Sequence, residues 1–168
     1  MQKIKSAFNL GNLITLFLIF LLVYFKWPQI NSSLQLEGKR DFSPQQLIDL
    51  RGKTIVQQYP SVMVFWASWC KPCEVELARI NRMIINSEIK AERVIAVAVD
   101  DDKDDLNREI EKRGYKFQVV WDQFGLLSKK YEVTATPTLI VFGQDKSIIW
   151  ATSGLSPLLE LKLRKYLN

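Results

Sequence analysis

Cys70 and Cys73 are the only cysteines in the 168-residue chain, and only Lys71 and Pro72 separate them. An apolar run at residues 62–65, typical of a buried strand, lies just ahead of them. If a helix begins at Cys70, the spacing places Cys73 one turn further along the same face, where the two sulfurs reach bonding distance. The pair therefore predicts a dithiol that forms and breaks one disulfide.

Two other uses of such a pair have to be weighed. A zinc site needs about four ligands, and the chain has no histidine and no third cysteine, which excludes a Cys/His zinc site. A purely structural disulfide across so short a gap would constrain the unfolded chain very little. The sequence favours a redox-active pair over an inert one, with the Cys70–Cys73 disulfide as the redox group and with no metal and no separate cofactor.

The start of a helix gives the two sulfurs different roles. Its unpaired N–H groups and positive dipole end favour a thiolate at Cys70, which makes this residue the candidate nucleophile. Cys73 would then resolve the mixed disulfide. Pro72 suits the first helical turn, where a missing N–H costs nothing. Lys71 either favours the thiolate further or is simply solvated, and both interpretations stay open.

Two blocks of sequence resemble the thioredoxin superfamily. Residues 62–73 are similar to its active-site strand and helix start, and residues 131–142 are similar to the segment around its cis-proline. The resemblance covers residues 34–167 and implies an α/β fold: a thioredoxin-like three-layer α/β/α domain with a central mixed sheet. Within the superfamily the chain looks most like the membrane-tethered TlpA, ResA and DsbE group, or the related ScsD proteins of copper tolerance.

This resemblance implies further site residues. Pro137 would be the cis-proline that faces the disulfide, and it would leave the backbone of Thr136 free to pair with an extended substrate segment. A trans proline at a strand edge is the alternative. Trp69 would form an apolar rim on which a substrate chain rests, whereas we expect Trp66 to pack in the core.

The chain also departs from the family pattern. Thioredoxins place a buried aspartate where this chain has Val64 and a lysine where it has Ala96, so that buried ion pair is absent. ResA-type proteins carry a glutamate between the cysteines, at the position of Lys71. The usual route for deprotonating Cys73 is therefore missing. Glu76, one helical turn after Cys73, is the candidate substitute, and an ordinary surface glutamate is the alternative.

Residues 7–25 carry no charge and would span about 28 Å as a helix, close to the thickness of a bilayer core. Lys3 and Lys5 precede this run and predict that the N-terminus stays in the cytoplasm. A cleaved signal peptide is the alternative, but no alanine occurs between Ala7 and Ala67 to form the usual cleavage site. We expect a single-pass protein of the inner (cytoplasmic) membrane whose catalytic domain faces the periplasm.

The chain is expected to divide into a cytoplasmic tail (1–6), a transmembrane anchor (7–25), a polar linker (26–33) and the thioredoxin-like domain (34–168). Predicted strands are 34–42 (two, around a turn), 62–65, 94–99, 119–120, 138–142 and 147–151. Predicted helices are a turn at 44–50, then 70–85, 104–113, one that Asp122 caps and that runs to Lys130, and a last helix with Ser156 at its N-cap and Pro157 at its first position.

Charge places further limits on function. The net charge is +5, but Lys3, Lys5 and Lys26 flank the apolar run and the rest of the chain is nearly balanced, so nucleic-acid binding is not expected. The acidic run at residues 100–105 lies between a predicted strand and the start of a predicted helix. Helix capping accounts for it better than a calcium or copper site does.

These observations predict a periplasm-facing thiol:disulfide oxidoreductase that reduces disulfides in partner proteins. Its electrons would come from a membrane donor such as a DsbD/CcdA-type protein. A non-catalytic substrate-binding or chaperone module, or a dithiol oxidase, is the alternative. The sequence leaves the physiological substrate open among apocytochrome c during cytochrome c maturation, proteins under copper stress, and a general set of clients.

Overall fold

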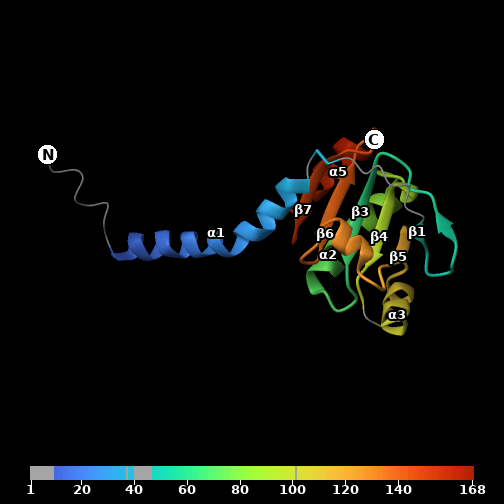
Figure 1. The fold of residues 1–168 in the computed structure, drawn as a ribbon, viewed down its shortest axis with the longest axis horizontal. Coiled ribbons are helices and arrows are strands. Elements are labelled where there is room, and N and C mark those ends of the chain that lie inside the picture. Colours follow the sequence, from blue (N-terminus) through green and yellow to red (C-terminus); the bar gives the residue numbers. More distant parts are fainter. Residues whose placement is uncertain (1–9, 37, 40–46, 101) are drawn as a thin grey trace.

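The structure, a computed structural model, describes residues 10–36, 38–39, 47–100 and 102–168 (Figure 1). Its centre is a five-stranded sheet with the strand order β5-β4-β3-β6-β7. The strands are β3 (Ser61–Trp66), β4 (Val94–Ala98), β5 (Gln118–Trp121), β6 (Thr138–Phe142) and β7 (Ile148–Ser153). β3, β4 and β5 run parallel, while β6 and β7 are antiparallel to their neighbours. The predicted mixed sheet is therefore confirmed.

The central strand β3 is buried along its whole length. Val62, Val64 and Trp66 face one hydrophobic cluster, and Met63 and Phe65 face the other. Because successive side chains of a strand point to opposite faces, an unbroken apolar run implies packing on both sides of the sheet. β3 therefore carries the disulfide segment outward from the middle of the domain.

Helices cover both faces of the sheet. One hydrophobic cluster takes side chains from α2 (Lys71–Ile85), α3 (Lys103–Arg113) and α5 (Leu159–Leu167). The other takes Leu127 from the short helix α4 (Leu126–Lys130) and Leu36 from the end of α1. A single turn of 3-10 helix, η1 (Ala91–Arg93), precedes β4. The predicted three-layer architecture is confirmed.

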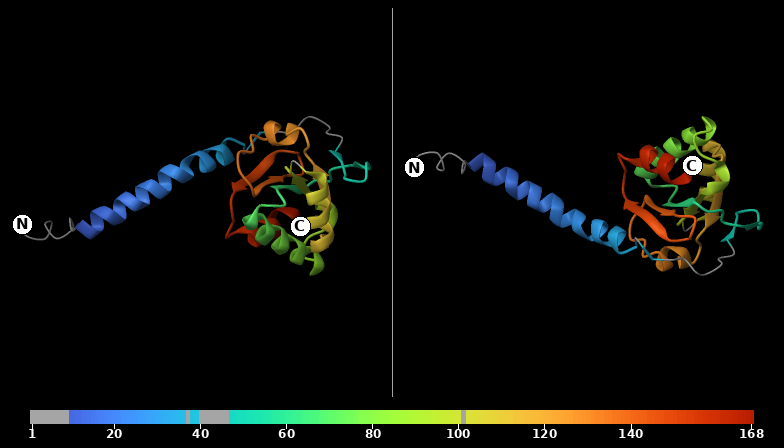
Figure 2. Two further views of the ribbon diagram at one scale, coloured as in Figure 1. Left: turned by 90° about the horizontal axis from the view of Figure 1, so that it is seen from below. Right: turned by 90° about the horizontal axis from the view of Figure 1, so that it is seen from above.

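Helix α1 (Leu10–Leu36) projects away from the α/β domain as a rod (Figures 1 and 2). It continues through residues 26–33, which were predicted to be a polar linker, and it includes residues 34–36, which were predicted to begin a strand. The prediction that residues 34–42 form two strands is therefore wrong for the first strand, and residues 40–42 lie outside the described part of the chain. Among the described residues, no helix is long and apolar enough to cross a membrane.

The chain after α1 joins the edge of the sheet. The backbone N–H of Gly38 donates to the carbonyl of Ile148 at 2.8 Å, and the N–H of Ile148 donates to the carbonyl of Lys39 at 2.9 Å. The next described residues form a small hairpin of β1 (Leu47–Ile48) and β2 (Thr54–Ile55). The helical turn predicted at 44–50 is wrong for Leu47 and Ile48, and residues 44–46 lie outside the described part.

Two helix ends test the capping predictions. Asp102 is the N-cap of α3, and its carboxylate accepts the backbone N–H groups of Asp104 and Asp105, which lowers its pKa. Capping is thereby confirmed for this part of the acidic run. The last helix, in contrast, begins at Leu159, so Ser156 is not its N-cap.

Candidate active site at the start of helix α2

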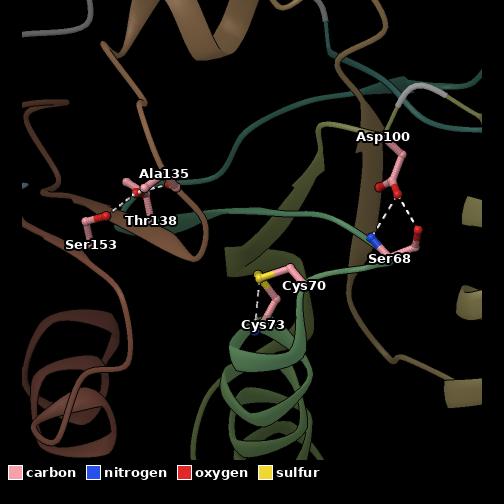
Figure 3. The surroundings of a disulfide bond; sticks show 7 residues. All are labelled: Ser68, Cys70, Cys73, Asp100, Ala135, Thr138 and Ser153. Atoms are coloured by element: carbon pink, nitrogen blue, oxygen red, sulfur yellow. Dashed lines mark hydrogen bonds between the residues drawn. A yellow bond between two sulfur atoms is a disulfide. The ribbon is translucent and has the colours of Figure 1, made fainter.

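Cys70 and Cys73 form a disulfide, with their Cα atoms 5.2 Å apart (Figure 3). Cys70 is the N-cap of α2, with extended backbone, and its sulfur lies 3.3 Å from the backbone nitrogen of Cys73, which donates to it. Pro72 lies within the first turn, as predicted. The N–H of Cys73 at the helix start thus points at the Cys70 sulfur, and this contact and the positive end of the helix dipole favour negative charge there.

The two sulfur-bearing residues differ in exposure. Cys70 is 5% exposed and Cys73 is fully buried in the hydrophobic cluster on the α2 side of the sheet. A molecule that approaches from solvent therefore reaches Cys70 before Cys73. This agrees with the predicted division into nucleophile and resolving thiol.

Two tryptophans ahead of the disulfide have opposite environments. Trp66 is buried and packs edge-on against Tyr115, with ring centroids 5.8 Å apart, which confirms the predicted core position. Trp69, directly before Cys70, is 70% exposed. A large aromatic side chain that stays exposed beside a reactive group is typical of a recognition surface. Its predicted role as a substrate rim stays a prediction.

The second predicted block lies across from the disulfide. The Thr136–Pro137 peptide bond is cis, as the resemblance implied. The carbonyl of Pro137 accepts the Gly154 N–H at 2.7 Å, and the Thr138 hydroxyl lies 2.7 Å from the Ala135 carbonyl, to which it donates (Figure 3). Thr136, half-buried, has no hydrogen bond within the part of the chain that the structure describes. Its backbone groups are therefore available to an extended segment.

The charge of Lys71 is directed along the helix surface. Its amino group lies 2.9 Å from the carboxylate of Glu74, which also pairs with Arg113 at 2.7 Å. The hydrogen bond from Lys71 is the main cause of the lowered pKa of Glu74. Of the two interpretations left open for Lys71, a paired and mostly solvated charge fits this geometry better than a partner for Cys70.

Glu76 is fully buried between α2 and the segment ahead of α5. Its carboxylate accepts the Ser156 N–H at 2.5 Å and lies 2.9 Å from a guanidinium nitrogen of Arg79, which also binds Glu160. Burial raises the pKa of Glu76 in spite of these donors. The surface alternative for Glu76 is wrong. Its role as proton acceptor for Cys73 stays a prediction.

A family model described as the AhpC/TSA family matches residues 31–151. The chain belongs to this family. The thiol-disulfide oxidoreductase ResA of Bacillus thuringiensis is 29% identical over 119 residues, which are 71% of this chain and 63% of that protein. A thioredoxin-like protein of Haemophilus influenzae is 28% identical over 98% of this chain and 96% of its own length. The chain thus spans less than two thirds of the ResA relative.

Solved structures agree on the fold of this AhpC/TSA-family chain. StoA from Bacillus subtilis superposes with a TM-score of 0.63 at 20% identity, over 76% of this chain and 100% of that one. A thio-disulfide isomerase from Thermus thermophilus gives 0.60 at 17% identity, over 73% and 90%. The predicted thioredoxin-like fold is confirmed.

The sequence did not predict that Asp100 contacts the loop before the disulfide. Asp100 follows β4 and reaches across to the loop before Cys70, where one carboxylate oxygen accepts the Ser68 N–H at 2.8 Å and also the Ser68 hydroxyl (Figure 3). The Trp121 ring nitrogen donates to the Asp100 carbonyl at 2.8 Å. The one feature that could have indicated this contact is that Ser68 and Asp100 each follow a predicted strand, because the carboxyl ends of neighbouring parallel strands lie at the same edge of a sheet.

The same acidic run does not form a metal site in the described part of the chain. No group of three or more His, Cys, Asp or Glu side chains able to hold a metal ion occurs among those residues. Asp100 and Asp102 instead turn in different directions, one to Ser68 and one to the N-terminus of α3.

Proposed function

We propose that this AhpC/TSA-family chain is an enzyme, a thiol:disulfide oxidoreductase that reduces disulfides in partner proteins. The observation that carries the proposal is the disulfide at the start of α2, with Cys70 at the N-cap and Cys73 buried one turn later. The relative from Bacillus thuringiensis is named a thiol-disulfide oxidoreductase, which supports the same chemistry.

The reaction follows from the positions of the two sulfurs. In the dithiol form, the Cys70 thiolate attacks one sulfur of a partner disulfide, which breaks that bond and releases the other partner sulfur as a thiolate. The thiolate of Cys73 then attacks the Cys70 sulfur of the mixed disulfide and displaces the second partner thiolate. Two electrons pass to the partner, and the Cys70–Cys73 disulfide forms.

The second step needs a group that takes the proton of Cys73. Glu76 lies three residues later on α2 and is buried, and its burial raises its pKa, which makes the carboxylate a stronger proton acceptor than an exposed glutamate. Thr136 and Trp69 would hold the partner chain, through backbone pairing and apolar contact respectively. Each of these roles is part of the proposal.

The proposed location rests on the sequence. The uncharged residues 7–25 and the preceding lysines support a membrane anchor with the catalytic domain in the periplasm. A membrane donor of the DsbD/CcdA type would then return electrons to the disulfide in that compartment. A C-terminal alkaline phosphatase fusion tests the orientation: an active fusion is expected, and an inactive fusion that is fully expressed contradicts it.

Insulin reduction tests the proposed activity. The full chain in detergent, supplied with dithiothreitol, should accelerate precipitation of the insulin B chain, and Cys70→Ser should lose the acceleration. Folded full-length protein that binds insulin without accelerating its reduction would contradict the proposal and favour a non-catalytic binding module.

A further inference from the structure

A cavity of about 350 Å³ lies next to the segment that precedes Cys70. Two of its lining residues are Trp69 and Thr136, which precede Cys70 and Pro137 in the chain. A partner segment that lies over Cys70 and pairs with the backbone of Thr136 would therefore pass along the mouth of this cavity. A side chain close to the reacting cysteine of that segment can enter it.

The cavity has a strongly acidic wall. Asp100 and Asp122 both line it, and they are only 4% and 8% exposed. No lysine or arginine is among the lining residues. Neither aspartate takes part in an ion pair with any residue that the structure describes. Buried carboxylates without a cation are costly, because desolvation is not offset by an opposite charge.

The two aspartates differ in their hydrogen bonds. Both oxygens of Asp122 accept neutral donors at the start of α4, namely the N–H of Leu127 and the N–H and hydroxyl of Ser128, at 2.7–3.0 Å. One oxygen of Asp100 takes both donors of Ser68. The other oxygen of Asp100 is buried and has no partner in the described part of the chain, and Figure 3 shows both hydrogen bonds from Ser68 ending on the first oxygen. Asp100 therefore has acceptor capacity to offer a ligand.

These features select the chemistry of the ligand. The exposed indole of Trp69 beside two carboxylates suits an organic cation, which an aromatic face and an acidic group both attract. A metal ion would have to displace the donors that Asp122 holds at the start of α4. An apolar side chain would leave both carboxylates buried without an opposite charge, and one oxygen of Asp100 without a hydrogen bond.

We propose that this cavity is a subsite for a lysine or arginine side chain located within two residues of the reacting cysteine of the partner polypeptide. The inference rests on the proposed reductase function and adds a substrate preference to it. A general electrostatic attraction does not account for the same preference, because Lys3, Lys5 and Lys26 supply three of the +5 net charges and the rest of the chain is nearly balanced rather than acidic.

Peptide disulfides test the subsite. The reduced full chain in detergent reacts with octapeptide dimers, each joined through a single cysteine, that carry lysine, arginine, norleucine or glutamate at one position within two residues of the cysteine. We expect lysine and arginine to raise the second-order rate constant about tenfold over norleucine at one or two such positions. Lysine four residues away should have no effect, and added salt should reduce the preference.

Two variants with the same loss of charge separate the subsite from the overall field. Asp100→Asn keeps an oxygen for Ser68 but removes the negative charge, so it should lose most of the preference for lysine. Glu111→Gln, at an exposed position of α3, should keep that preference. The wild-type peptide series decides the question even if Asp100→Asn fails to fold.

The outcomes distinguish this inference from the proposed function. Reduction of all peptides at the same rate would overturn the subsite and leave the reductase function intact. An unchanged lysine preference in Asp100→Asn would also overturn it. Failure to reduce any peptide would overturn both proposals together.

Discussion

Val64 of β3 and Ala96 of β4 lie opposite each other in the parallel register of the central sheet, and both are fully buried. They belong to the hydrophobic cluster that also contains Cys70 and Cys73. In thioredoxins, as the resemblance implies, these two positions carry an aspartate and a lysine. Here the sheet offers no ionisable group at this pair of positions, so the proton of Cys73 has to leave by another route.

Introducing a carboxylate at position 64 tests whether the surroundings of this position are apolar. Val64→Asp should lower the free energy of unfolding by about 3 kcal/mol or more at neutral pH, because the new charge is buried without a partner. Val64→Asn, which has the same shape and no charge, should lose less. The two variants should converge in acid, where the aspartate becomes neutral, as measured by urea unfolding over a range of pH. Equal losses at neutral pH would contradict this view of the site.

The difference in exposure between the two sulfurs predicts a difference in reactivity. After reduction, Cys70 should react with iodoacetamide at least about tenfold faster than Cys73, because it lies at the helix start and is the more accessible thiol. Brief alkylation near pH 7, followed by peptide mass spectrometry, measures both rates. Faster labelling of Cys73 would reverse the assignment of nucleophile and resolving thiol.

The raised pKa of Glu76 predicts a specific dependence of stability on pH. Burial raises the pKa of this carboxyl in the folded state, so the folded state binds its proton more tightly than the unfolded state does. The stability that this group contributes is therefore complete at low pH and is lost as pH rises through the folded pKa.

Glu76→Gln isolates this contribution. The stability of the wild type relative to Glu76→Gln should increase as the pH is lowered from about 7 to about 4, as measured by urea unfolding of the oxidised protein. The subtraction is necessary because Glu160 and Glu74 have lowered pKa values and slope in the opposite direction. If the stability of the wild type relative to Glu76→Gln decreased on acidification, this would show that the carboxyl of Glu76 does not have the raised pKa that its buried position implies.

The local elements around the site could be predicted from the sequence, because their signals are local. The apolar run before Cys70 predicted β3, and Gly114 marked the end of α3, where it adopts the left-handed conformation that favours glycine. The contacts of Glu76 and Asp100 were not predictable in the same way. Their partners Ser156 and Ser68 are 80 and 32 residues away in sequence, so only the assembled fold brings them together.

The buried face of α2 also could not be predicted from the local sequence. Val75 and Ile85 are apolar, yet Val75 is 50% exposed and Ile85 is 62% exposed. Glu76 is buried instead, because Arg79 and Ser156 provide it with donors. A periodicity of hydrophobic residues cannot anticipate a buried charge whose partners come from another part of the chain.

A protein that reduces disulfides in its partners, as proposed, should have a low reduction potential. The chain has no histidine that could stabilise the thiolate between the cysteines, and Lys71 is paired with Glu74. We expect a potential below about −200 mV on equilibration with glutathione, and a change of less than about 20 mV in Lys71→Ala. A value near that of the oxidant DsbA, about −120 mV, would indicate a dithiol oxidase instead.

Trapping of the mixed disulfide tests most directly the claim that Cys70 attacks and Cys73 resolves. Cys73→Ser, reduced and mixed with a peptide disulfide, should form one stable adduct per molecule at Cys70, as identified by mass spectrometry. Cys70→Ser should form little or none in the same time, because its remaining thiol is buried. Rapid adduct formation in Cys70→Ser, or disulfide turnover that survives in that variant, would contradict the account.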